Sequence, residues 1–233
     1  MNKPTETSFE NHRTRVGLER REKTRALLMK SAVEVFAKKG PDLPVIDDFI
    51  AAAGVARGTF YNYFSTTSEL LAAVTAEMSD EVLSIIDPEV MKFDDPAVRI
   101  CVGARLYVHM ATRYPMWGIF LTRIGSQHAV RGKFMDVYLT RDVELGIATN
   151  RFTVASALVT RDIILGSVFF GIETLLTEPS HVHHTEDMLY IVLHGMGLKA
   201  KEARKIAYMP LPETGAVSGQ IFSVIFPRSV PPD

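Results

Sequence analysis

The sequence predicts an all-α protein: a small N-terminal domain of three helices with a helix-turn-helix motif, followed by a larger C-terminal helical domain. Three observations predict this fold class. Apolar residues recur at helical spacing through most of the 233-residue chain. Glycine, proline and capping residues interrupt this pattern at short intervals, as they do between helices. The two-residue alternation that is typical of a strand is confined to residues 221–226.

The N-terminal segment contains a polar stretch and then four expected helices. Residues 1–18 are polar and unpatterned, so we expect a flexible basic arm. The expected helices are residues 19–39, which end at Gly40-Pro41, residues 44–53, residues 57–64, and a longer helix that opens at the Thr-x-x-Glu capping box of residues 66–69. The first domain is therefore expected over residues 19–80, with the helix-turn-helix motif at about 45–64.

The remainder of the chain is expected to form helices separated by short breaks. The predicted helices cover residues 96–114, 115–126, 133–148, 154–176, 186–196 and 199–208. These helices define a second domain over residues 81–210. Two polar stretches flanked by proline follow, so residues 211–233 are expected to be a C-terminal tail.

Composition limits the protein class. With 47% apolar and 23% charged residues, the chain can bury a substantial core. Its N-terminus is polar and it contains no run of about 18 apolar residues, so we expect a cytoplasmic protein without a membrane partner. The single cysteine, Cys101, excludes an internal disulfide and a zinc site made of several thiolates, and we expect it to be buried.

The stretch GVARGTFYNYF at residues 54–64 carries the clearest functional signal. Gly54 permits a tight turn, and Phe60 and Phe64 are four residues apart, so both should enter the core with Val33, Phe36 and Phe49. The remaining positions project outward with no carboxylate among them; they are Arg57, Gly58, Thr59, Tyr61, Asn62 and Tyr63. Guanidinium, amide and hydroxyl groups pair well with base edges and phosphates. We therefore expect contact with double-stranded DNA.

Residues 20–75 resemble the DNA-binding domain of the TetR family of bacterial transcriptional repressors. The resemblance rests on VEVFAKKG in the first helix, on DDFIAAAGVARGTFYNYF, and on the following SELL. It implies that the expected helix over residues 57–64 is the recognition helix of a regulator that a small molecule releases from its operator. Residues 1–40 carry ten Lys and Arg against five Asp and Glu, and Arg20, Arg21 and Arg25 are expected to reach the DNA backbone or the minor groove. Asp47 either accepts from a cytosine amine or caps its helix.

The C-terminal domain contains a segment that is apolar nearly all round, residues 154–176. Such a helix cannot face water, and the resemblance implies a homodimer. We expect an interface of two helices from each subunit that includes Ile164, Gly166, Ser167, Gly171, Leu175, Met188, Leu189, Val192 and Met196. The alternative is that residues 154–176 form the buried central helix of a monomer.

A pocket for a largely apolar effector is expected where aromatic residues and methionine gather. The candidate lining residues are Tyr107, Met110, Tyr114, Trp117, Phe120, Tyr138 and Phe169. The alternative is that this stripe is ordinary core.

Enzyme and metal chemistry find little support in the sequence. His181, His183 and His184, with Glu186 and Asp187, resemble metal ligands, but they stand in an expected loop where histidines are usually solvated. No nucleophile motif or phosphate-binding glycine loop is present, so we expect no enzyme, cofactor or metal. The alternative hypothesis is a helical protein that binds a small molecule or metal and uses its helix-turn-helix only for packing.

Overall fold

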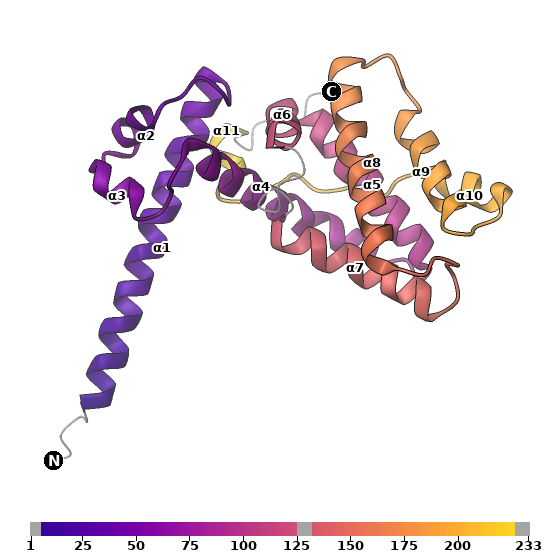
Figure 1. The fold of residues 1–233 in the computed structure, drawn as a ribbon, viewed down its shortest axis with the longest axis horizontal. Helices are drawn as coiled ribbons and strands as arrows, with labels where there is room; N and C mark the ends of the chain where they lie inside the picture. Colours follow the sequence, from indigo (N-terminus) through magenta and orange to yellow (C-terminus); the bar gives the residue numbers. More distant parts are fainter. Residues whose placement is uncertain (1–5, 125–131, 227–233) are drawn as a thin grey trace. The chain divides into compact units, whose positions relative to one another are not determined.

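The computed structural model describes the backbone of residues 6–124 and 132–226, with side chains described over 15–124 and 135–226. Every regular element in these ranges is a helix, which confirms the all-α prediction (Figure 1). The chain divides into two compact units at Leu70–Leu71, ten residues before the boundary expected from the sequence. We call residues 1–70 unit 1 and residues 71–233 unit 2.

Unit 1 contains α1 (Glu6–Lys39), α2 (Ile46–Ala53), α3 (Arg57–Tyr61) and the start of α4 (Thr67–Val90). Helix α1 begins at Glu6, whereas a flexible arm was expected over residues 1–18. No proline occurs between Glu6 and Lys39, and Arg15 Nε lies 3.8 Å from a Glu19 oxygen one helical turn away, so nothing ends the helix in this region. Residues 1–5 lie outside the described residues.

Four phenylalanine rings form the core of unit 1. Phe36 lies 5.0 Å from Phe49 between ring centroids, Phe49 lies 6.4 Å from Phe60, and Phe60 lies 6.1 Å from Phe64. All four side chains are buried, as is Val33. The core positions predicted from the four-residue spacing are thus confirmed, and their burial fixes which face of α3 is left outside.

The ends of the short helices follow the predicted local chemistry. Gly54 ends α2 with a positive φ of 63°, which favours glycine. The capping box at the start of α4 is confirmed, because Glu69 N donates to Thr66 Oγ1 at 3.0 Å and the Glu69 carboxylate accepts from Ser65 N at 2.7 Å.

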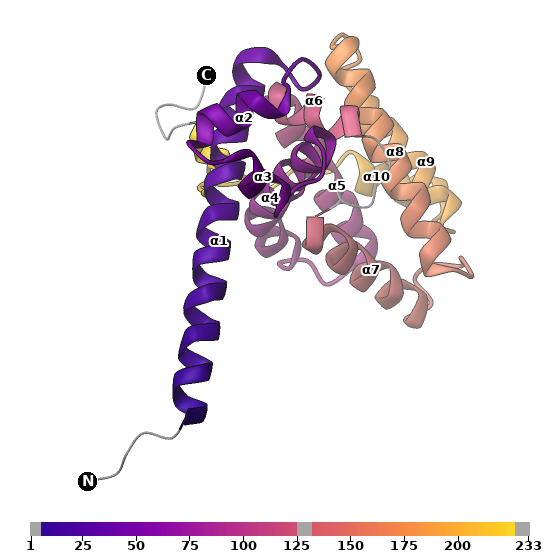
Figure 2. The same ribbon diagram turned by 60° about the vertical axis from the view of Figure 1, so that its left-hand side comes forward.

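Unit 2 contains the rest of α4 and seven further described helices. They are α5 (Pro96–Arg113), α6 (Pro115–Ile124), α7 (Gly132–Ala148), α8 (Ala157–Thr177), α9 (His184–Gly195), α10 (Ala200–Ala207) and α11 (Phe222–Ile225). Helix α5 packs against α6, α7, α8, α9 and α10, so it is central to this unit. Helices α8 and α9 lie side by side in both views (Figure 2). Cys101 is buried in α5, as expected.

The C-terminal segment has more order than a tail. Residues 210–219 lack regular structure, and α11 then forms where the sequence showed strand-like alternation. Within 6–124 and 132–226, no helix combines the length and the apolar character that a membrane span requires.

We expect Gly197→Ala to destabilise the turn between α9 and α10. Gly197 has a φ of +105°, and an added Cβ would lie 2.2 Å from Thr153 Oγ1. The strain should lower the free energy of unfolding by about 1–3 kcal/mol, as measured by urea denaturation. Gly215→Ala is the control because nothing lies within 4 Å of its added Cβ. Equal stability of the two variants would contradict this interpretation.

Candidate nucleic-acid interface and ligand cavity

An ion pair joins the two helices of the helix-turn-helix motif. Arg57, the first residue of α3, donates from Nη2 to Oδ1 of Asp47 in α2. The Asp47 carboxylate raises the pKa of Arg57, and Tyr61 adds to this effect. The cap of α2 comes instead from Asp48, whose Oδ2 accepts from Val45 N at 3.0 Å. Asp47 was expected either to accept from a cytosine amine or to cap its helix. The capping role belongs to Asp48 instead.

The outward face of α3 is accessible. Arg57, Gly58 and Asn62 are exposed, and Tyr61 has 48% of its surface exposed. No atom lies within 4 Å of a Cβ built on Gly58, so another surface can approach the backbone closely at this point. Thr59 and Tyr63 are half-buried at the edge of the same face.

A hollow between α1 and α3 brings together residues that are far apart in the sequence. It is lined by Gly17, Arg20, Arg21, Thr24, Thr59, Asn62 and Tyr63. The Arg21 guanidinium carbon lies 5.8 Å from the centroid of the Tyr63 ring, and that of Arg25 lies 5.8 Å from the Phe64 ring. The expected arginines of the first helix thus adjoin the expected recognition residues, and the lining contains no carboxylate. A concave, cationic, hydroxyl-bearing surface suits a phosphate backbone.

Unit 2 contains a cavity of about 60 Å³ between α4, α5, α7 and α8. Its apolar lining comprises Leu83, Ile86, Val90, Ile100, Gly103, Ala104, Met135, Leu139, Ile164, Leu165 and Val168. Two candidate pocket residues from the sequence, Tyr107 and Tyr138, also line it. Of the other five, Met110, Trp117 and Phe120 are fully buried in the core. Tyr114 packs on Phe222, Phe169 is half-buried on α8, and none of the five lines this cavity.

An ionic network forms part of the cavity lining. Asp142 is 3% exposed, and its carboxylate accepts from Arg141 Nε at 3.0 Å, from Arg141 Nη2 at 2.9 Å and from Arg99 Nη1 at 3.4 Å. Arg141 Nη2 also donates to Asp87 at 2.9 Å, and these carboxylates raise the pKa of Arg141. The Arg141 guanidinium lies 5.2 Å from the Tyr138 ring centroid, and burial raises the pKa of that phenol.

This network was missed from the sequence, although one signal was present. Met135, Tyr138, Leu139 and Asp142 follow the spacing i, i+3, i+4, i+7, so a carboxylate stands on the otherwise apolar face of α7. A charge in that position requires a cationic partner nearby. The identity of that partner depends on which helices pack together, and the local sequence pattern does not show which helices do so.

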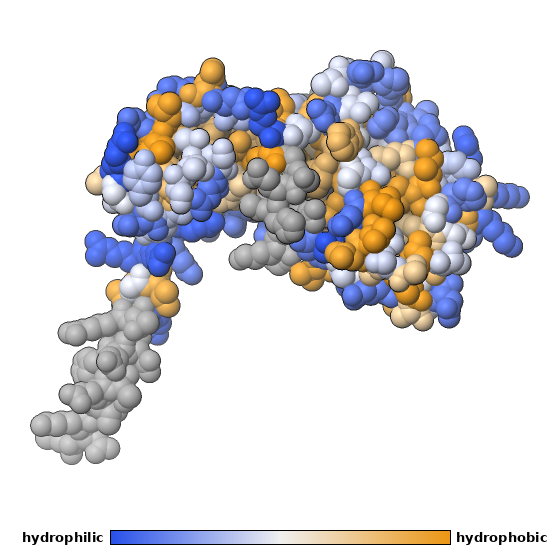
Figure 3. All heavy atoms as spheres, in the orientation of Figure 1, coloured by the Kyte–Doolittle hydropathy of each residue, from blue (hydrophilic) through white to orange (hydrophobic). Residues whose placement is uncertain are grey.

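Helices α8 and α9 present an apolar surface that the sequence indicated only in part. Of the interface candidates, Ile164, Gly171, Leu189, Val192 and Met196 are buried within the chain, while Gly166, Ser167, Leu175 and Met188 are half-buried. The exposed apolar side chains on the same helices are different ones and include Ile163 at 56% exposure, Phe170 at 73% and Ile191 at 67%. A groove between the two helices includes Ile163, Ser167, Met188 and Ile191. Hydrophobic surface is visible where α8 lies (Figure 3).

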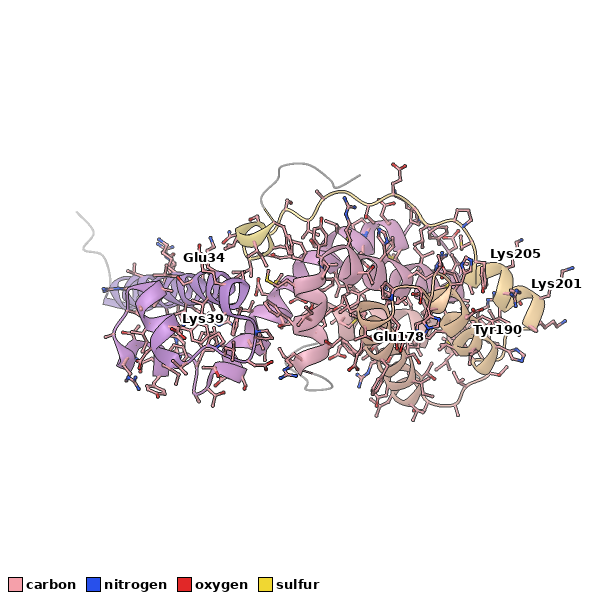
Figure 4. All side chains as sticks on the ribbon, turned by 90° about the horizontal axis from the view of Figure 1, so that it is seen from above. Glu34, Lys39, Glu178, Tyr190, Lys201 and Lys205 are labelled. Carbon is pink, nitrogen blue, oxygen red and sulfur yellow. The ribbon has the colours of Figure 1, made fainter. Side chains whose placement is uncertain are left out.

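The histidines of the loop between α8 and α9 do not converge on one point. His181 Nε2 lies 3.0 Å from Oε2 of Glu178, which is labelled in Figure 4, and His183 lies beside the Tyr208 ring. Within the described ranges, no three His, Cys, Asp or Glu side chains gather at metal-binding distance. The metal version of the alternative hypothesis therefore gains no support from this geometry.

Comparisons with known proteins agree with this arrangement. Residues 28–74 match the model of the bacterial regulatory proteins of the tetR family, and residues 95–209 match a tetracyclin repressor-like C-terminal domain. A crystal structure of RolR with the ligand resorcinol is 31% identical, with a TM-score of 0.74; the match covers 85% of this chain and 100% of that one. RolR without ligand has a TM-score of 0.71 at 30% identity, over 82% of this chain and all of that one.

A curated sequence relative matches over a shorter region. The uncharacterized HTH-type transcriptional regulator YvdT of Bacillus subtilis (strain 168) is 37% identical over 59 residues. These residues make up 25% of this chain and 30% of YvdT, so that likeness concerns less than a third of the relative.

We expect Arg57→Ala to weaken binding to a selected DNA site by about 1–3 kcal/mol and to relax discrimination at one base pair, because a guanidinium held at the helix start can pair with guanine. Asp47→Asn should instead tighten binding to random DNA, because a carboxylate leaves the surface, and should also reduce discrimination. Competition gel shifts at two salt concentrations measure both effects. Glu34→Gln, at the α1 position labelled in Figure 4, removes the same charge elsewhere in unit 1. Discrimination that survives Arg57→Ala would contradict the assignment.

Proposed function

Because the chain belongs to the TetR family of bacterial regulatory proteins, we propose that it is a sequence-specific DNA-binding transcriptional repressor that a small molecule releases from its operator. The observation that carries this proposal is the hollow between α1 and α3, where Arg20 and Arg21 adjoin Thr59, Asn62 and Tyr63 without an intervening carboxylate. Because the proposed target is bacterial operator DNA, the protein acts in the cytoplasm.

Helices α3 and α1 make different kinds of contact with DNA. Arg57 is held by Asp47 at the start of α3, so its orientation is partly fixed before it meets a base. Arg20, Arg21 and Arg25 on α1 supply cationic contacts to the phosphate backbone and make the affinity fall as salt rises. Thr59, Tyr61, Asn62 and Tyr63 supply further donors and acceptors at the edge of the groove.

The effector site is the cavity in unit 2, and the effector is a small, mostly apolar ring with hydroxyl groups. The apolar walls suit the ring, while Asp142, Arg141 and Asp87 offer acceptors and donors for hydroxyls. RolR, which shares the fold and 31% identity, was crystallised with resorcinol. At about 60 Å³ the cavity is smaller than the roughly 300–1,000 Å³ of drug-sized ligand sites, so even a single ring requires the lining to move.

The functional unit is a homodimer that pairs through α8 and α9. Ile163, Phe170 and Ile191 leave more than half of their surface exposed on these adjoining helices, which is costly in water. A two-fold axis brings the same patch of each subunit together and covers both at once. Such pairing sets the spacing of the two recognition helices, and with it the separation of the operator half-sites.

The function is tested by selecting DNA from a random pool with the full chain and measuring the salt dependence of binding. We expect one enriched inverted repeat, a steep loss of affinity with salt, and release on addition of resorcinol or a related phenol. Tight phenol binding without any DNA affinity would favour the alternative of a helical small-molecule-binding protein whose helix-turn-helix serves only for packing.

We expect Asp142→Asn to reduce phenol affinity by about tenfold or more, because the network loses its anionic acceptor and Arg141 and Arg99 lose their shared partner. Isothermal calorimetry measures the affinity. Glu144→Gln, an exposed carboxylate on the same helix, is the matched control. Equal affinities for the two variants would place the ligand elsewhere.

We expect Ile191→Glu to dissociate the dimer, raising its dissociation constant at least about a hundredfold, because the change buries charge at the centre of the paired surface. Sedimentation velocity gives the oligomeric state. Val182→Glu changes an exposed apolar residue in the loop between α8 and α9 and should leave the dimer intact. A dimer that persists in Ile191→Glu would refute pairing through α8 and α9.

A further inference from the structure

The chain after α10 forms a strap along unit 2 that neither family match covers. The C-terminal match ends at residue 209, and the strap, which we define as residues 210–226, continues from there to α11 (Figure 4). The chain is attached just before the strap begins, where Arg105 Nη1 donates to the Met209 carbonyl at 2.5 Å. Val217, Ile221 and Phe222 are buried, so the strap packs into the unit despite its lack of regular structure up to residue 219.

A carboxylate on α4 holds the far end of the strap. The two oxygens of Glu81 accept from the backbone N–H groups of Ile221 at 2.8 Å and Phe222 at 2.7 Å. Burial raises the pKa of Glu81, while these backbone donors oppose that rise. The approach is so close that a Cβ on Gly219 would lie 1.9 Å from the Glu81 carboxyl carbon. Helix α4 spans Thr67–Val90, so the strap is bonded to the helix that contributes to both units.

A row of aromatic side chains connects the strap with the effector cavity. Tyr107 lines the cavity, donates its hydroxyl to Ser79 Oγ on α4 at 3.1 Å, and contacts the Trp117 ring at 5.0 Å between centroids. Trp117 in turn lies 6.0 Å from Phe222, whose N–H is one of the two that donate to Glu81. Among the described residues Trp117 Nε1 has no hydrogen-bond partner, so packing alone positions this ring.

We propose that the strap senses occupancy of the effector cavity. Filling the cavity displaces Tyr107, Trp117 and Phe222 in turn, and this breaks the hydrogen bonds between the strap and Glu81. This inference rests on the proposed function and adds a means of regulation to it.

The direction of the coupling follows from packing. With the strap seated, the cavity holds about 60 Å³, whereas an apolar cavity that takes up benzene measures about 150 Å³. A ring must therefore displace part of the lining, and close-packed interiors pass such strain to their neighbours. Tyr107 and Trp117 belong to helices that pack against several others, whereas the strap has no regular structure up to residue 219. The strap gives way first, and by reciprocity its release favours effector binding.

The test compares cavity filling with an equal change elsewhere in the full-length protein. Ala104→Leu adds volume to the cavity wall, and Ala148→Leu adds the same side chain at an exposed position on α7. We expect Ala104→Leu to speed amide hydrogen exchange at Ile221 and Phe222 about tenfold, and to shift the emission of Trp117, the single tryptophan of the chain, to longer wavelength. Gly103→Ala adds one methyl group to the same wall and serves if the larger change prevents folding.

The reverse direction uses resorcinol as the probe. Glu81→Gln weakens the hydrogen bonds from Ile221 and Phe222 while preserving the shape of the side chain. We expect it to raise resorcinol affinity at least about fivefold, the lower end of common coupling strengths. Glu144→Gln is the charge-matched control. Unchanged affinity in Glu81→Gln overturns the proposal.

Other outcomes separate this proposal from the proposed function. Equal exchange in Ala104→Leu and Ala148→Leu, or amides of Ile221 and Phe222 that are unprotected in the wild-type chain, overturns the strap proposal. Neither measurement needs DNA or an effector. Absence of DNA binding by the wild-type chain would instead overturn the proposed function, and failure of resorcinol to bind any variant would overturn only its effector class, leaving amide exchange to decide on the strap.

Discussion

The arrangement of unit 2 around its cavity depends on burying one carboxylate, Asp142. A charge removed from water is tolerated only when cations and hydrogen-bond donors surround it, and here Arg99 on α5 and Arg141 on α7 supply them. Arg141 extends the network to Asp87 on α4, and Arg99 Nε donates to the Phe93 carbonyl at 2.6 Å. Three helices are thereby fixed in register beside the cavity. The same groups that satisfy the charge add polar atoms to a mostly apolar lining.

Unit 1 also contains an ion pair between an arginine and an aspartate, but this pair has a different role. Its short third helix has five residues, too few to be stable alone, and is held by burial of Phe60 against Phe49. Once that face is fixed, everything on the other side is available for contact. Asp47 and Arg57 neutralise one another at the surface, where such pairs add little stability, so the pair is better understood as orienting a guanidinium than as holding the fold together.

Local chemistry explains which features could be predicted from the sequence. Phe60, Phe64 and the Thr66–Glu69 capping box were predictable because each depends on residues within one or two helical turns. The start of α1 was not, since a polar, unpatterned segment is compatible with both coil and exposed helix. The aromatic residues around Trp117 were expected to line a pocket, with ordinary core as the alternative, and pattern alone cannot distinguish a core position from a cavity wall. Arg99 and Asp142 are 43 residues apart, so their pairing requires the tertiary fold.

Substitution of Gly219 should be detectable in a genetic selection. Any side chain at this position would occupy the space of the Glu81 carboxylate, so a single missense change there acts on α4 without touching the cavity or the recognition helix. Selections for altered induction would therefore return alleles at residues 81 and 219 together with those at the cavity. Residues 81 and 219 both lie outside the two matched family domains.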